Sequence, residues 1–115
     1  MEEYQFIYSG PLLYKSTLLK EDVSALLKIC NKNKKVKFNH QLAGAIKDEY
    51  LIEDVKPVRS ILNEYMKNFS NVHQHWYNRT FNSFKFSSVW TNFMKAGEYN
   101  PPHTHENCTF SSVFF

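Results

Sequence analysis

The sequence predicts a single α+β domain in which two helices precede most of the strands. Two patterns support this fold class: apolar residues recur at helical spacing up to about residue 76, and they alternate with a period of 2 from residue 81 onward. The length agrees, because 115 residues, 43% of them hydrophobic and 17% aromatic, can form one modest core but not two domains. We therefore treat residues 1–115 as one domain.

The N-terminal third is expected to contain an extended region and then a helix. Residues 4–14 are rich in aromatic and branched side chains and are interrupted by Ser9-Gly10-Pro11, which predicts a strand, a turn and a second extended stretch. Thr17 is the expected cap of the helix that follows. Four apolar positions of this helix fall at i, i+3, i+4 and i+7, namely Val23, Leu26, Leu27 and Cys30.

A polar loop and a second helix occupy the middle of the chain. Residues 31–49 are polar and contain a glycine, so we expect a long, partly ordered loop. Asp54 is the expected N-cap of the next helix, and Pro57 is tolerated in its first turn, where its missing N–H costs nothing. The apolar stripe of this helix, which we expect to pack against the sheet, consists of Val55, Val58, Ile61, Leu62, Tyr65 and Phe69.

Strands are expected in the last third of the chain. A strand over residues 84–94 would place Phe84, Phe86, Ser88, Trp90, Asn92 and Met94 on one face. Residues 96–102 form a turn-rich loop, and residues 109–115 begin another strand, which is unfinished at Phe115. An unpaired strand templates association, so we expect this edge to self-associate.

Charge and hydropathy exclude several classes of protein. The net charge of +3 is spread along the chain, and the densest basic run, residues 32–37, is expected to be a solvated helix end rather than a nucleic-acid surface. No stretch approaches the roughly 20 apolar residues of a membrane span. The acidic N-terminus does not have the pattern of a signal peptide, so we expect a cytoplasmic protein, in the host cytoplasm if a phage encodes it.

Two closely spaced histidines are the candidate metal ligands. His103 and His105 are two residues apart, which in extended backbone points both imidazoles to one side, and two prolines before them stiffen the approach. Glu106 is an awkward third ligand, because neighbouring residues of an extended chain point to opposite faces. A second pair, His73 and His75, lies on the predicted second helix, where residues two apart do not face each other.

The context of the histidines resembles a known family. The stretch concerned is Trp90-Thr91-Asn92-Phe93-Met94-Lys95-Ala96-Gly97-Glu98-Tyr99-Asn100-Pro101-Pro102-His103-Thr104-His105. Together with the strand expected after it, this stretch resembles the start of the double-stranded β-helix (jelly-roll) core of iron(II)- and 2-oxoglutarate-dependent oxygenases. More closely, it resembles those encoded by marine phages that infect cyanobacteria and related bacteria. Three upstream segments also resemble that group, namely residues 10–13, 42–44 and 47–52.

The resemblance implies an oxidoreductase whose cofactors are iron(II) and 2-oxoglutarate. His103 would be the first iron ligand, and His105 would replace the carboxylate that most such oxygenases carry at this point. The family's distal histidine and its basic 2-oxoglutarate-binding residue lie on later strands, so we expect these residues to form an incomplete jelly roll that is inactive alone. Asn92 on the strand, and Tyr99 and Asn100 on the loop, are candidates for contacting cofactor or substrate.

Two other functions compete with the oxygenase. Gly97 followed by five residues and then His103-Thr104-His105 also fits the first half of the cupin metal motif, which indicates a metal or small-molecule binder. A non-catalytic phage structural or interaction protein with an oxygenase-like fold is the alternative from a different class. In the oxygenase interpretation the substrate is a small molecule or a protein side chain.

Overall fold

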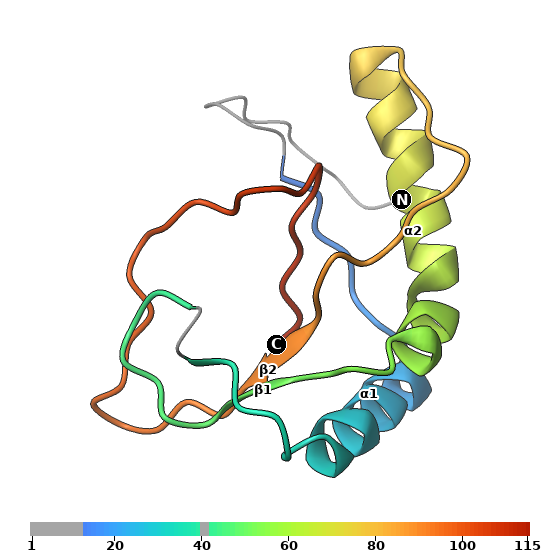
Figure 1. The fold of residues 1–115 in the computed structure, drawn as a ribbon. Helices are drawn as coiled ribbons and strands as arrows, with labels where there is room; N and C mark the ends of the chain where they lie inside the picture. The colour runs from blue at the N-terminus through green and yellow to red at the C-terminus, as the bar shows by residue number, and fades with distance from the viewer. Residues whose placement is uncertain (1–12, 40–41) are drawn as a thin grey trace.

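The computed structural model describes residues 13–39 and 42–115. Within these ranges the order of elements is α1 (Lys20–Lys32), β1 (Glu49–Leu51), α2 (Lys56–Tyr77) and β2 (Trp90–Asn92), as Figure 1 shows. The two strands form an open antiparallel sheet, so the expected α+β class is confirmed. The strand and turn expected over residues 4–14 lie almost entirely outside the described residues.

Helix α1 forms where the spacing predicts it, but its N-terminus is capped differently. The N-cap is Leu19 rather than Thr17, and no side chain of the α1 N-terminus caps it. The Leu19 N–H instead donates to the Tyr65 hydroxyl of α2 at 2.9 Å, and that hydroxyl donates to Asp22 at 2.6 Å. The Tyr65 hydroxyl therefore takes the place of a local capping side chain at the start of α1, and it links α1 to α2.

Helix α2 extends over 22 residues, as the apolar stripe predicts. Pro57 occupies its first turn. Asp54 stands one residue before the N-cap, Val55, and its Oδ1 accepts the Lys56 N–H at 3.2 Å, so it serves the helix terminus from outside it. Asn78 ends the helix in a left-handed conformation (φ 51°), with its N–H donating to the Gln74 carbonyl.

Strand β1 was not expected, because residues 31–49 read as loop. Glu49, Tyr50 and Leu51 pair with Asn92, Thr91 and Trp90 of β2. On its other side β1 contacts the segment after α1: the Phe38 N–H donates to the Glu49 carbonyl at 3.0 Å, and the Leu51 N–H to the Val36 carbonyl at 2.8 Å. β1 is therefore hydrogen-bonded to β2 on one side and to residues 36–38 on the other.

The expected strands of the last third are mostly absent from the described residues. Regular pairing covers residues 90–92 of the predicted 84–94 strand, and residues 109–115 form no strand. A strand is stable only when a neighbour takes up its backbone hydrogen bonds, and β1 pairs with three residues of β2. The alternating pattern of residues 84–89 therefore does not become a ladder.

The core lies where the two helices meet the end of the sheet. Its buried centre is Ile52, Val58 and Leu62, which connects the end of β1 to α2. The half-buried side chains around it are Leu18, Leu26, Ile29, Ile61, Tyr65, Phe86 and Val89. The stripe of α2 therefore packs on α1 and on the residues that flank both strands. None of the described helices is long and apolar enough to cross a membrane.

The basic run after α1 folds back onto the sheet. Lys37 Nζ lies 3.2 Å from Asp48 Oδ1 and 4.6 Å from the centre of the Tyr50 ring, while Lys95 Nζ lies 2.8 Å from Asp48 Oδ2. Hydrogen bonds from Lys95 and then Lys37 lower the pKa of Asp48 to about 2. The lysines are exposed, as expected for a solvated segment, yet they also fix residues 34–37 beside β1.

Candidate metal site

The candidate ligands lie on an exposed segment that follows β2. Gly97 (φ 83°) makes the turn, and the Glu98 carboxylate closes it by accepting the Lys95 N–H at 2.9 Å and the Lys47 N–H at 3.2 Å. The Tyr99 carbonyl then accepts the Ala45 N–H at 2.9 Å. The segment is therefore tied to the loop before β1 four residues ahead of His103.

The two imidazoles converge as the spacing predicts. His103 Nε2 and His105 Nε2 are 3.0 Å apart, and His103 Nδ1 donates to the Pro101 carbonyl at 2.7 Å. Because Nδ1 carries that proton, the neutral ring leaves the lone pair of His103 on Nε2. Two nitrogen ligands at about 2.1 Å from one cation, at a right angle, are themselves about 3.0 Å apart. The contact is at present a hydrogen bond from His105 Nε2–H to His103 Nε2, so a cation held by both nitrogens would take the place of that proton.

Trp90 supports the second histidine. The indole stacks on the His105 ring with centroids 5.8 Å apart and planes inclined by 16°, and its centroid lies 5.7 Å from that of the Phe38 ring. Trp90 is half-buried. Trp90 belongs to one face of the predicted 84–94 strand, and its ring is the surface on which the His105 ring stacks.

The described residues supply no third ligand to this pair. No group of three or more His, Cys, Asp or Glu side chains in residues 13–39 and 42–115 is arranged to hold a metal ion. Glu106 and Cys108 follow closely in the chain and are both exposed. His73 and His75 of α2 do not converge: His73 Nδ1 bonds to the Arg79 carbonyl at 3.0 Å instead.

The three candidate cofactor contacts have different surroundings. Asn92 lies on the outer part of β2, and in the amide orientation that satisfies both its atoms it donates to Glu49 Oε1 and to the Thr91 carbonyl at 3.2 Å. The Tyr99 side chain is 60% exposed. Asn100 is exposed and lies against Gly44. The Tyr99 and Asn100 side chains are thus open to a ligand, whereas the Asn92 amide is engaged with Glu49.

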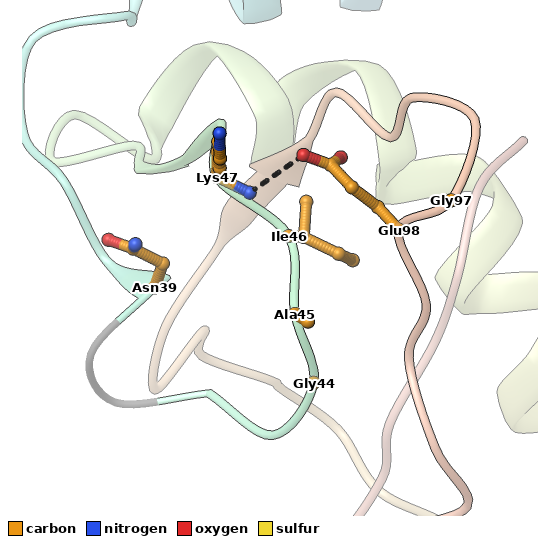
Figure 2. A pocket seen from close by; sticks show the side chains of 7 residues that line it. All are labelled: Asn39, Gly44, Ala45, Ile46, Lys47, Gly97 and Glu98. Atoms are coloured by element: carbon orange, nitrogen blue, oxygen red, sulfur yellow. Dashed lines mark hydrogen bonds between the residues drawn. The ribbon is translucent and has the colours of Figure 1, made fainter.

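An open hollow of about 440 Å³ lies beside this segment and not at the histidines. Its lining, shown in Figure 2, is Asn39, Gly44, Ala45, Ile46, Lys47, Gly97 and Glu98. The Glu98 carboxylate points across it toward the Lys47 backbone (Figure 2), and its hydrogen bonds to backbone N–H groups, that of Lys95 first, lower its pKa. Because both oxygens of the Glu98 carboxylate are hydrogen-bonded within the turn, this group is not available to bind a ligand in the hollow.

Glu49 is a residue that sequence reasoning missed. It is 2% exposed and is the largest fully buried side chain among the described residues, and burial raises the pKa of its carboxyl group, with the charge of Glu98 adding to the effect. It stands opposite Asn92 in the ladder, on the sheet face that also presents Trp90. A carboxylate in a polar segment gives no sign of burial in the sequence.

Comparisons with known proteins add no relative. No protein-family model, curated protein or solved structure matches this chain. The candidate function is therefore supported by the geometry of the histidine pair and by the resemblance of residues 90–105 to the oxygenases.

Proposed function

We propose that His103 and His105 are two ligands of an iron(II) centre in a 2-oxoglutarate-dependent oxygenase of the jelly-roll type. The observation that supports this most is the 3.0 Å separation of the two Nε2 atoms, with the His103 ring oriented by the Pro101 carbonyl. A metal-binding histidine usually gives its other ring N–H to such a partner, which fixes its tautomer. The resemblance of residues 90–105 to the oxygenases supports iron as the metal.

Each residue of the site has a defined task in this proposal. His103 and His105 hold the metal, Trp90 keeps the His105 ring in place, and Tyr99 and Asn100 face the bound 2-oxoglutarate or the substrate. When bound, iron(II) supplies oxygen activation coupled to decarboxylation of 2-oxoglutarate to succinate, which the side chains cannot supply. The third ligand and the basic residue for 2-oxoglutarate come from later strands or from another chain. The substrate is a small molecule or a protein side chain.

Metal titration of a histidine variant tests the site. Wild-type protein should bind Co²⁺, used as an oxygen-stable substitute for iron(II), with a visible absorption band, and His103→Ala should bind it about tenfold or more weakly. His75→Ala is the matched control, because His75 is an exposed histidine on α2 outside the pair. Equal affinity in the wild type and His103→Ala would reject the assignment.

Addition of 2-oxoglutarate separates the oxygenase from the competing functions. In an oxygenase the cofactor should perturb the spectrum of the bound metal, and in the cupin-type binder it should not. A protein that binds neither metal nor 2-oxoglutarate is the non-catalytic interaction protein. A spectral change on addition of 2-oxoglutarate therefore favours the oxygenase over the other two functions.

We also propose that the C-terminal segment associates with a second copy of the chain. Residues 109–115 form no strand, but they leave Val113 75% and Phe114 48% exposed. Covering apolar side chains this exposed with another surface lowers the free energy of the system. Light scattering should show a mass that rises with protein concentration, and a constant monomer mass would contradict the proposal.

A further inference from the structure

The segment that carries the histidines is held again beyond them, by Phe110. The ring of Phe110 lies 5.0 Å from Phe69, 5.3 Å from His73 and 5.4 Å from Phe81, measured between centroids, and meets the first two nearly edge to face. We call these four residues the Phe110 cluster. Aromatic pairs at these distances attract each other beyond the area they bury.

The partners of Phe110 form a fixed seat. Phe69 and His73 are one turn apart on α2, and Phe81 belongs to the chain that turns back after the helix. Two hydrogen bonds hold that return: Ser70 Oγ donates to the Phe81 carbonyl at 3.2 Å, and His73 Nδ1 donates to the Arg79 carbonyl at 3.0 Å. These two hydrogen bonds, which do not involve Phe110, hold Phe81 close to Phe69 and His73.

Among the described residues, few other contacts attach this end of the chain. After β2 the chain makes a wide excursion on the side away from α2 and then returns toward the middle of the molecule (Figure 1). Within the described residues, no backbone–backbone hydrogen bond ties residues 106–115 to the rest of the protein. The histidine segment is thus fixed by the Tyr99 bridge before it, by the Trp90 stack beneath His105, and by Phe110 after it.

We propose that Phe110 is a positioning residue for the metal site. By closing residues 99–110 into a loop with both ends attached, it reduces the conformations open to His103 and His105 and keeps their Nε2 atoms converged. A site organised in advance binds its ligand more tightly, because less order must be imposed on binding. This inference rests on the proposed metal-binding function, and it adds a residue that touches neither the metal nor the cofactor.

Substitution of Phe110 in the full chain tests the inference. Phe110→Ala should bind Co²⁺ about tenfold more weakly than the wild type, the size expected from losing the ring contacts of the Phe110 cluster. Phe110→Tyr, which keeps the ring, should restore the affinity. Phe114→Ala is the matched control, since it removes an exposed ring from the same segment. If Phe110→Ala does not fold, Phe110→Leu keeps the apolar volume without the ring, and its affinity should fall between those of the alanine variant and the wild type.

A measurement without metal separates this inference from the proposed function. Imidazole ¹⁵N NMR of the metal-free protein should show the His103 and His105 rings in contact in the wild type and in Phe114→Ala, and released in Phe110→Ala. Folded Phe110→Ala protein with unchanged ring signals and unchanged Co²⁺ affinity overturns the inference. Wild-type protein that binds no Co²⁺ overturns the proposed function, while the NMR comparison still decides whether Phe110 positions the pair.

Discussion

Glu49→Gln is expected to raise the free energy of unfolding by about 1–3 kcal/mol at pH 7, and to change it little near pH 3. The Glu49 side chain is 2% exposed, and its carboxylate has the Asn92 amide as its hydrogen-bond partner. Ionisation therefore leaves a poorly solvated charge beside the sheet, and the nearby charge of Glu98 opposes it further. A neutral amide of the same shape avoids that cost and can still pair with Asn92.

The pH dependence follows from the direction of the pKa shift. Burial raises the pKa of Glu49 in the folded protein above its unfolded value, so the folded state binds more protons at intermediate pH. The contribution of Glu49 to stability is present below the unfolded pKa and is lost as the pH rises through the folded pKa. The advantage of Glu49→Gln should therefore appear over the same interval and persist above it.

Asp48, the residue before Glu49, provides a control, because its pKa is shifted in the opposite direction. Its pKa is lowered to about 2 by Lys95 and Lys37, so its contribution is present above the unfolded value of 3.8 and is lost as the pH falls through about 2. Asp48→Asn should destabilise the protein at pH 6 and have little effect near pH 2. Urea unfolding followed by circular dichroism from pH 2 to 8 measures both variants. If the difference in free energy of unfolding between Glu49→Gln and the wild type does not vary with pH, the ionised Glu49 carboxylate does not destabilise the folded protein.

Both helices could be predicted because they have a long periodic signal. The spacing of Val23, Leu26 and Leu27 locates α1, and the six-residue stripe with Pro57 in the first turn locates α2. The cap of α1 could not be predicted, since its partner, Tyr65, is 46 residues away. Local patterns predict local structure, and this contact is not local.

The sheet was predicted less well, for a physical reason. The alternation of apolar residues over residues 84–94 is typical of an extended chain. Regular strand pairing, however, covers only the three residues of β2 that pair with β1. β1 itself contains Glu49, whose charge is typical of a loop and conceals a buried position. Residues 109–115 have strand-like composition, yet the ring of Phe110 is docked on α2.

The convergence of His103 and His105 was predicted from their spacing, whereas the residues that support them were not. Two imidazoles two residues apart in extended backbone must point to one side, and their Nε2 atoms are 3.0 Å apart. The supports, Trp90 and Phe110, stand 15 residues before and 5 residues after His105 and act through ring contacts. Such contacts depend on how the whole chain folds, and no short motif encodes them.

Gly44→Ala is expected to lower the free energy of unfolding by about 2–4 kcal/mol and to weaken the histidine site with it. Gly44 has φ +104°, which side-chain-bearing residues rarely adopt, and a Cβ there would lie 2.6 Å from the Tyr99 carbonyl oxygen and 3.2 Å from Asn100 Cα. Both contacts are with backbone, so a rotamer change cannot relieve them. The Ala45–Tyr99 bridge, which attaches the histidine segment at its start, would have to open.

Gly97→Ala separates the strain of the backbone from the clash. Gly97 also has positive φ, +83°, but a Cβ there would meet nothing within 4 Å. Its substitution should cost about 1–2 kcal/mol from backbone conformation alone. Urea unfolding gives both costs, and Co²⁺ titration should show weaker binding for Gly44→Ala than for Gly97→Ala. Equal costs and equal affinities in the two variants would mean that the close approach of Tyr99 to Gly44 does not constrain the segment. A larger effect at Gly44 would establish that the loop before β1 holds the histidines from one end, as Phe110 does from the other.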